Sequence, residues 1–305
     1  MLKIEGLKLA PGESEALLYE RAAAALRVKA PLHTLHILRR SIDARDGVTF
    51  IYTVSAAIEN EERVLRRARN KSVSVYAPAF YELPPMIAPP AVRPVVIGAG
   101  PAGLFAALRL IERGYRPIVL ERGKRVAERK RDIAQINRNG AVDPDSNYAF
   151  GEGGAGTFSD GKLFTRSKKR GDYHKALQTL VFHGASEEIL YEAHPHIGTD
   201  KLPRIISNIR RTIEAAGGAI RFGSRVTGFD LRDGRITGVR CGDERIEGAA
   251  VVLATGHSAR DVYEALYAGG VRVEAKPFAM GVRIEHPQAL VDSIQYHCRE
   301  RGEYL

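Results

Sequence analysis

Two glycine-rich stretches hold the residues whose types and spacing could support chemistry. The first runs from Arg93 to Gly123, where Gly98, Gly100 and Gly103 form G-x-G-x-x-G between an apolar strand and a helix. Such glycines allow a sharp turn and let a pyrophosphate approach the backbone at the helix N-terminus, where partial positive charge favours anions. The pattern predicts a dinucleotide-binding β-α-β unit, and a tight turn of purely structural role is the alternative.

An acidic residue completes this unit. Glu121 ends a second apolar strand, residues 118–120, and stands 18 positions after Gly103. A carboxylate at this place can accept hydrogen bonds from a ribose diol, and it would repel a 2′-phosphate. The unit therefore predicts a dinucleotide with a free ribose diol, and NADP is a poor fit for this site.

The second stretch, residues 150–163, holds five glycines within eleven positions: Gly151, Gly153, Gly154, Gly156 and Gly161. Because glycine carries an entropic cost on folding, such a run indicates backbone that must lie close to something. Its amide groups could form an anion nest, and Ser159, Asp160 and Lys162 add a hydroxyl, a carboxylate and a cation. We interpret the stretch as a loop wrapped over a bound cofactor. A flexible surface loop is the alternative.

Length and composition are those of an ordinary water-soluble protein of about two domains. The chain has 305 residues, of which 44% are hydrophobic and 27% charged. No apolar run approaches the roughly 20 residues of a membrane helix, and the N-terminus lacks a signal-peptide pattern. Cys241 and Cys298 lie far apart, which argues against a redox disulfide or a cysteine-built metal site and fits a cytoplasmic location.

The formal net charge is +10, with basic clusters within residues 66–71, 122–131 and 166–170. We interpret these clusters as solvated faces and loops. Attraction to nucleic acid or to an anionic substrate is the alternative. Nucleic acid is the less favoured partner, because no aromatic side chains interleave with the clusters as a stacking platform would need.

Residues 1–82 are predicted to form a separate small domain. Hydrophobic alternation and turn residues predict strands over 2–9, 32–39, 48–58 and 72–76, with helices over 13–28 and 61–69. The order β-α-β-β-α-β is that of a ferredoxin-like α+β domain. A linker follows over residues 83–94, since its five prolines cannot continue a helix or a central strand. The run 39–45 in this domain is a charged strand end or, less favoured, a substrate or interdomain contact.

Residues 95–276 are predicted to form an α/β domain whose parallel sheet carries an antiparallel meander. Beyond the first β-α-β unit, the patterns predict helices over 124–137, 172–183, 186–194, 202–216 and 262–267, and strands over 219–226, 226–231, 235–241, 244–246 and 250–254. Residues 277–286 alternate like a further strand, on which Gly281, Arg283 and Glu285 share a face that could reach a pocket.

Two shorter features lie near the end of predicted elements. Thr255 and Gly256 follow the strand 250–254, so they would lie at the cofactor crevice, with an ordinary strand exit as the alternative. His194 and His196 stand two apart without further ligands at suitable spacing, so we predict no metal site. A place in the lining of a pocket is the other interpretation of these histidines.

The chain resembles the glutathione-reductase-like FAD group of flavoproteins, through VVIGAGPAGL at 95–104, the acid at 121 and VVLATG at 251–256. The run GEGGAGTFSDGKL at 151–163 is similar to that of an uncharacterised group of bacterial FAD-dependent dehydrogenases with an N-terminal ferredoxin-like domain. This resemblance implies a Rossmann-like FAD-binding domain over 95–276 and a substrate domain that begins at 277. Because such proteins usually continue well past this point, we expect residues 277–305 to be an incomplete domain, either of a truncated chain or of an unusually short member.

The resemblance implies FAD as the cofactor and assigns its contacts. The diphosphate would meet Gly98, Gly100, Pro101, Ala102, Gly103, Thr255 and Gly256; the adenosine would meet Glu121, Arg122, Lys124 and the backbone of Val226; and the ribityl chain and flavin would meet Gly153, Gly154, Ala155, Gly156, Thr157, Ser159, Asp160 and Lys162. For catalysis we expect Lys162, or a backbone N–H of residues 153–157, to stabilise negative charge on the flavin. His257 is the expected group for proton transfer.

These observations predict an FAD-dependent oxidoreductase that acts on a small molecule. NAD(P)H is a candidate donor, and it would bind elsewhere because only the G-x-G-x-x-G at 98–103 stands between an apolar strand and a helix. The alternative is an RNA-associated flavoprotein or binding module that uses the basic surface and the ferredoxin-like domain. Substrate, electron acceptor and oligomeric state are left open by the residues.

Overall fold

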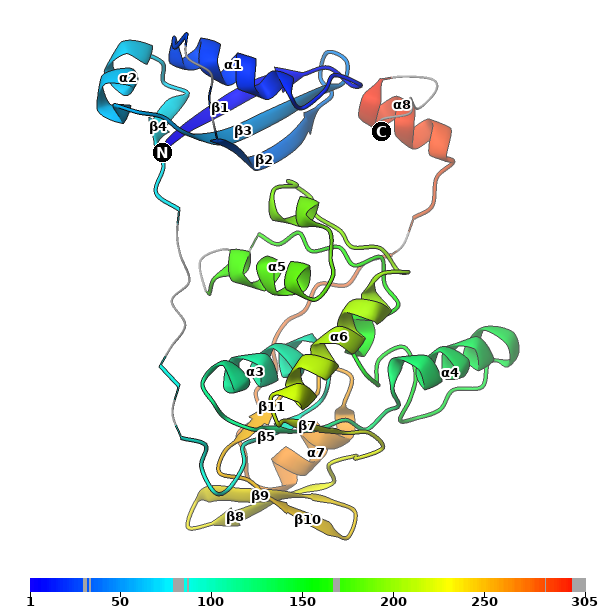
Figure 1. Ribbon diagram of the computed structural model, residues 1–305. Helices are drawn as coiled ribbons and strands as arrows, with labels where there is room; N and C mark the ends of the chain where they lie inside the picture. The colour runs from blue at the N-terminus through cyan, green and yellow to red at the C-terminus, as the bar shows by residue number, and fades with distance from the viewer. Residues whose placement is uncertain are drawn as a thin grey trace.

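The computed structural model describes residues 1–29, 32, 34–78, 85–86, 88–166, 171–282 and 284–297. It is a mixed α/β structure with a small antiparallel sheet at the N-terminus, a parallel sheet and a three-stranded meander (Figure 1). Part of the predicted linker 83–94, Arg283 and residues 298–305 of the predicted substrate domain lie outside the described residues.

The N-terminal unit contains six elements in the predicted order. They are β1 (Leu2–Leu9), α1 (Leu17–Leu26), β2 (Thr34–Asp43), β3 (Thr49–Ala57), α2 (Glu61–Ala68) and β4 (Val73–Val75). The sheet order is β2-β3-β1-β4 with every pair antiparallel, and both helices pack on one apolar core. Helix α1 begins later than predicted because the Glu13 side chain accepts from the N–H of Ala10 at 2.6 Å in a preceding turn.

The parallel sheet contains β5 (Val95–Ile97), β6 (Ile118–Leu120), β7 (Ala219–Arg221) and β11 (Val251–Leu253), in the order β11-β5-β6-β7. Helices α3 (Pro101–Glu112) and α6 (Leu202–Ala215) pack together on one face (Figure 1). Strand β7 is shorter than the predicted 219–226, because the chain turns at Gly223, where φ is +64°.

The meander covers the opposite face of this sheet. It contains β8 (Gly228–Arg232), β9 (Arg235–Cys241) and β10 (Glu244–Glu247), which pair antiparallel. Side chains alternate along β5: Val96 packs with the helices, whereas Val95 and Ile97 pack with Val239 and Ile246 of the meander. The continuous apolar run 95–97 follows from this two-sided burial.

The remaining elements connect these layers: α4 (Val126–Asn139), η1 (Gly154–Gly156), α5 (Tyr173–Phe182), η2 (Glu187–Leu190), α7 (Arg260–Ala268) and α8 (Gln288–Tyr296). The prediction of a helix over 186–194 is wrong beyond the single 3₁₀ turn η2. The chain leaves the helix there because residues 191–193 bond to the backbone of β2 at Arg40.

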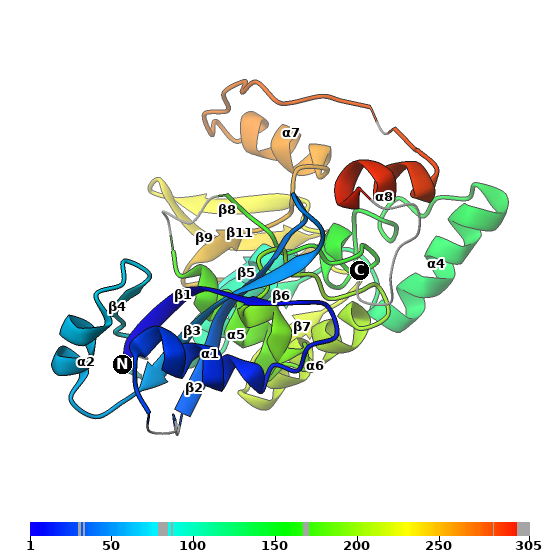
Figure 2. The same ribbon diagram turned by 90° about the horizontal axis from the view of Figure 1, so that it is seen from above.

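The predicted strand over 277–286 is also wrong for the residues described there. Figure 2 shows the described residues between α7 and α8 as an extended connection rather than a strand. Phe278 and Met280 are 83% and 88% exposed, and both Gly281 and Glu285 are exposed and lie outside the cleft described below. Alternation alone does not make a strand, since a strand also requires a neighbour for its backbone N–H and C=O groups.

Candidate functional site

A cleft of about 240 Å³ lies at the carboxyl ends of β5, β6 and β11. Five segments supply its lining: Ile97, Gly98, Gly100, Pro101 and Ala102; Leu120, Glu121 and Arg122; Ala149, Phe150, Gly151, Gly154, Ala155 and Gly156; Ser224, Arg225 and Val226; and Ala254, Thr255, Gly256, His257, Ser258, Ala259 and Val262. Ligands of open α/β sheets bind at this edge of the strands.

The first glycine-rich turn sets the position of helix α3. Gly98 has φ +102° and donates its N–H to the carbonyl of Leu120 at 2.7 Å. A Cβ built on Gly98 would overlap the carbonyl of Ala254, and one built on Gly103 would overlap the carbonyl of Gly98. Glycine at 103 therefore lets α3 lie close to β5, and glycine at 98 lets the turn lie close to the end of β11. Pro101 occupies the start of the helix, and the free N–H groups of the first turn lie at the cleft.

Glu121 is only 4% exposed and joins three loops around the cleft. Its carboxylate accepts from the backbone N–H groups of Ala99 at 2.7 Å, Gly123 at 2.8 Å and Gly151 at 3.0 Å. A carboxylate offers about four lone-pair positions, so about one is left for a ligand hydroxyl. The spacing between Gly103 and Glu121 in the sequence predicts a contact of Glu121 with the ligand, but it does not predict this structural role.

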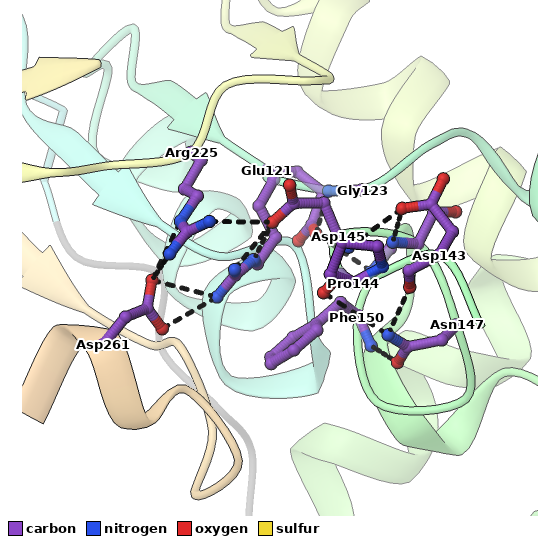
Figure 3. A network of polar contacts seen from close by, with 12 residues as sticks. Glu121, Gly123, Asp143, Pro144, Asp145, Asn147, Phe150, Arg225 and Asp261 are labelled. Atoms are coloured by element: carbon purple, nitrogen blue, oxygen red, sulfur yellow. Dashed lines mark hydrogen bonds and ion pairs between the residues drawn. The ribbon is translucent and has the colours of Figure 1, made fainter. Parts of the chain in front are cut away.

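Arg122 and Arg225 line the mouth of the cleft and form a charged cluster with Asp145 and Asp261. Figure 3 shows Arg225 and the two aspartates of this cluster. Arg122 donates to Asp145 at 2.6 Å and to Asp261 of helix α7 at 3.0 Å, and its guanidinium lies 4.3 Å from the ring centroid of Phe150. Arg225 donates to Asp261 at 3.0 Å. Burial alone would raise the pKa of Asp261, but the two arginines outweigh burial and lower it. The cluster therefore stays ionised at neutral pH and ties α7 to the loop at 145.

Lys124, predicted to contact the adenosine, is not part of the cleft lining. Its ammonium pairs with Asp132 at 2.8 Å and with Asp143 at 3.1 Å. The pKa of Asp143 is lowered, first by the backbone N–H of Asp145 and then by Lys124. The lysine thus connects helix α4 to the following loop. Its charge is paired within the protein.

The second glycine-rich stretch contributes Gly154, Ala155 and Gly156 to the cleft as the 3₁₀ turn η1. Gly153 lies just outside the lining, where it donates its N–H to the carbonyl of Ala99 at 2.8 Å. Thr157 is fully buried, and its hydroxyl donates to the carbonyl of Glu152 at 2.8 Å. The loop therefore presents backbone, and not the threonine side chain, to the cleft.

A network of buried charged side chains stabilises this loop through hydrogen bonds. Arg129 is fully buried and donates to the carbonyls of Asn147 at 2.8 Å, Tyr148 at 3.0 Å and Glu152 at 2.9 Å, and to the Thr157 hydroxyl at 3.1 Å. The Glu152 carboxylate is likewise buried and accepts from the N–H of Val126 and from Arg210, both at 2.8 Å. Sequence reasoning missed both residues, although a charge inside the run of glycines at 151–156 was a usable signal.

Three further predicted cofactor residues are exposed and lie outside the cleft lining. The Ser159 hydroxyl donates to the carbonyl of Gly156 at 2.8 Å. Lys162 pairs with Asp160 at 3.0 Å, with side chains 79% and 56% exposed, and this hydrogen bond lowers the pKa of Asp160. The structure therefore places the Lys162 ammonium in solvent.

The last segment brings Thr255, Gly256 and His257 to the cleft, opposite Val226, which is 6% exposed. Ser224, Arg225, Ser258 and Ala259 also line it and were not predicted. Each of them is a close sequence neighbour of a predicted residue, and that proximity is the signal that could have found them.

His194 and His196 lie apart from the cleft. The ring of His194 packs 4.6 Å from that of Phe164, and His196 bridges to Lys162 in a short antiparallel pairing. Within the described ranges, no three His, Cys, Asp or Glu side chains gather as metal ligands. No helix in those ranges is long and apolar enough to span a membrane.

Three family models match parts of the chain. Residues 93–129 match an FAD binding domain, residues 277–305 match the C-terminal domain-like part of FAD-dependent proteins, and residues 1–58 match a domain of unknown function. The first match covers the glycine turn, Glu121 and the start of α4, and the second is named for dependence on the same cofactor. The chain is therefore an FAD-binding flavoprotein.

Among curated proteins, an uncharacterized protein of Clostridium beijerinckii is 38% identical over 307 residues. The alignment covers 97% of this chain and 56% of that protein, so the chain spans about half the length of its relative.

Two solved structures show a weaker likeness. THI4 of Thermovibrio ammonificans has a TM-score of 0.40 at 18% identity, covering 59% of this chain and 64% of that one. The glycerol-3-phosphate dehydrogenase of Bacillus halodurans complexed with FAD has a TM-score of 0.37 at 15% identity, covering 57% and 36%. Scores this low carry no functional information.

The residues at the cleft fit FAD. Gly100 and Gly154 face each other across the two glycine-rich turns, where a Cβ on Gly154 would come within 3.1 Å of the Cα of Gly100. Backbone thus approaches backbone without side chains between, and the N–H groups of the α3 N-terminus meet this place. A diphosphate is the anion that such a helix end accepts, and Glu121 provides the acceptor expected beside a ribose.

Proposed function

We propose that this flavoprotein is an oxidoreductase, in the class of FAD-dependent dehydrogenases. The observation that carries the proposal is the cleft itself, with the glycine turn at 98–103, Glu121 and the backbone of Gly154–Gly156 facing one space. FAD supplies electron or hydride transfer when bound, and the protein supplies orientation and electrostatics. We further assign residues 1–82 to a ferredoxin-like domain, 95–276 to a Rossmann-like domain and 277 onward to a substrate domain.

In this proposal each lining segment has a task. The α3 N-terminus, Thr255 and Gly256 bind the diphosphate, Glu121 binds the adenosine ribose, and the backbone of Val226 meets the adenine. The N–H of Gly154 is already donated to the carbonyl of Gly151 at 2.8 Å. The backbone N–H groups of Ala155 and Gly156 stabilise negative charge on the flavin ring, as preorganised donors do in other enzymes. This role suits them better than Lys162, because they line the cleft and Lys162 does not.

His257 is the proposed group for proton transfer, since it lines the cleft and histidine is the side chain that most often acts as a general acid or base. The substrate is proposed to be a small molecule, and NAD(P)H is retained as the candidate donor. The expected cytoplasmic location stays a prediction.

A second candidate is an RNA-associated flavoprotein. The observation that favours it is the basic surface of α2 and the turn after it, on a chain of net charge +10. Arg66 is 78% exposed, and Arg67 and, in the turn, Lys71 are also exposed. Phosphate contacts release counterions, so this alternative requires RNA retention that falls steeply with salt.

The experiment is visible absorption spectroscopy of the purified chain before and after heat release of its ligand, followed by anaerobic reduction with NADH and NADPH. We expect flavin bands, released FAD, and bleaching by at least one donor or by a donor substrate from a screen of small molecules. A flavin that binds and is reduced by none of them, together with salt-sensitive RNA retention, would favour the second candidate. A colourless chain that takes up no added FAD would refute both.

A further inference from the structure

The N-terminal unit contacts the rest of the chain at Arg40 of strand β2. We propose that this contact is a dock that fixes the 159–162 end of the second glycine-rich loop, and that Arg40 is therefore a positioning residue for the cleft. The proposal goes beyond the oxidoreductase assignment, and its main test does not depend on it.

The dock begins as backbone pairing on an exposed sheet edge. Strand β2 is the edge strand of the order β2-β3-β1-β4, so one side of it presents unpaired N–H and C=O groups. The N–H of Arg40 donates to the carbonyl of Tyr191 at 2.8 Å, and the N–H of Ala193 donates to the carbonyl of Arg40 at 2.9 Å. Segment 191–193 thus extends the sheet by a short parallel bridge, as peptides do when they add to a sheet edge.

The Arg40 side chain adds charge to this pairing. Its Nε donates to Glu192 Oε1 at 2.8 Å, its Nη2 bonds to the same oxygen, and its Nη1 donates to Glu15 at 3.2 Å. The guanidinium also lies 5.5 Å from the ring centroid of Tyr191. The Arg40 and Glu192 side chains are 25% and 30% exposed, so the pair is less screened than an ordinary surface ion pair. Arg40 therefore connects Glu15 of the N-terminal unit to Glu192 of the rest of the chain.

The residues that follow the docked segment 191–193 pair with the end of the glycine-rich stretch. The N–H of Leu163 donates to the carbonyl of Pro195 at 2.8 Å, and the N–H of Ile197 donates to the carbonyl of Gly161 at 3.1 Å. The N–H of Gly198 donates to the carbonyl of Asp160 at 3.0 Å. Residues 195–198 and 160–163 thus form a short antiparallel ladder, so a displacement of the first segment must displace the second.

The ladder ends at the cleft. Ser159 donates both its N–H, at 3.1 Å, and its hydroxyl, at 2.8 Å, to the carbonyl of Gly156, which lines the cleft. The Ser159 hydroxyl in turn accepts from the N–H of Gly161 at 3.1 Å. Two sets of hydrogen bonds, joined by the covalent backbone of residues 193–195, therefore connect Arg40 to the cleft lining. Such a path carries coupling only if a change at one end moves the other, and this can be measured.

The test is hydrogen–deuterium exchange of the full chain without added FAD, on Arg40→Ala and Glu192→Gln. Arg39→Ala is the matched control, because Arg39 is the exposed neighbour on the same strand. Losing hydrogen bonds between charged groups should accelerate amide exchange about tenfold in both 191–198 and 159–165. Exchange in β1 and β3 should stay unchanged, which shows that the N-terminal unit remains folded. Glu192→Gln removes the negative charge from the same contact without altering that unit.

Faster exchange confined to 191–198 would overturn the coupling, and unchanged exchange in both segments would overturn the dock. If Arg39→Ala accelerated exchange in the two segments as much as Arg40→Ala, Arg40 would have no specific role in positioning them. A second readout is the fluorescence of bound flavin: we expect it to change in Arg40→Ala and to return in part in Arg40→Lys, which keeps the charge but not the planar fork. Failure to bind FAD would speak against the proposed function and leave the exchange result to decide the dock.

Discussion

Replacing Arg129 with methionine tests whether a buried guanidinium organises the glycine-rich loop at the cleft. Methionine is long and unbranched, so it fills much of the same space while donating no hydrogen bond. Burial lowers the pKa of Arg129 to about 10, against the opposing effect of Glu121 and Glu152, so the group still carries its charge at neutral pH. The substitution therefore removes a cation. It also removes the four hydrogen bonds that Arg129 donates to the carbonyls of Asn147, Tyr148 and Glu152 and to the hydroxyl of Thr157.

The expected loss follows from these contacts. Hydrogen bonds to a charged group contribute about 1.5–3 kcal/mol each. The cost of burying the guanidinium offsets part of their sum, and the Thr157 hydroxyl keeps its bond to Glu152. We expect the free energy of unfolding to fall by about 3 kcal/mol, which is the size seen when one partner of a buried charge contact is removed. For a unit of about 200 residues this lowers Tm by about 6–12 °C.

The assay is thermal unfolding of the purified chain by circular dichroism, with the FAD dissociation constant measured in parallel by fluorescence titration. Arg131→Met is the matched control, because Arg131 lies exposed on the same helix. We expect a large fall in Tm and weaker FAD binding for Arg129→Met only. If its Tm stayed within about 2 °C of the control and FAD bound equally well, the buried network would not organise the loop and the reasoning would be refuted.

Two more predictions concern the cleft. Gly103→Ala should weaken FAD binding by at least about tenfold, because the added Cβ overlaps the Gly98 carbonyl and pushes α3 from β5, whereas Gly281→Ala, in open space, should leave it unchanged in the same titration. FAD binding should also fall in acid: since the pKa of Asp261 is lowered in the folded chain, its ion pairs are complete above the unfolded value of about 3.9 and are lost as pH falls through the lower folded value. A titration from pH 7 to 3 should show this loss, and Asp261→Asn should bind weakly with a flatter profile; a profile identical to that of the original chain would contradict the assignment.

The β-α-β unit at the cleft could be predicted because each of its signals is local. The apolar run 95–97, the glycine spacing and Gly114 after the helix act within a few residues, so β5, α3 and β6 follow from short-range rules. The element order of residues 1–82 follows for the same reason. The predicted ends of elements were wrong where another local structure competed with the helix or strand. The Glu13 side chain bonds the backbone before α1, and the chain turns at Gly223 after β7.

The charged cluster at the mouth of the cleft could not be predicted, because it depends on strand order. Arg122 and Asp261 are separated by 139 residues, and they meet only because β11, which precedes α7, pairs beside β5. Nothing near Asp261 in sequence marks it as the partner of an arginine. The same holds for Arg40 and Glu192, separated by 152 residues. Long-range pairs of this kind require the tertiary arrangement.

The exposed position of Lys162 also decides between the two groups expected to stabilise charge on the flavin. An exposed ammonium interacts through water, where Coulomb energies are several-fold weaker than in a partly buried cleft. Asp160 already neutralises it at 3.0 Å, and ordering its flexible side chain would cost further entropy. Ala155 and Gly156 line the cleft with their backbone, and the loop that carries them is held by the network around Arg129. A fixed backbone donor loses nothing on binding, so the physical balance favours the backbone and makes Lys162→Ala a nearly silent change in flavin reduction.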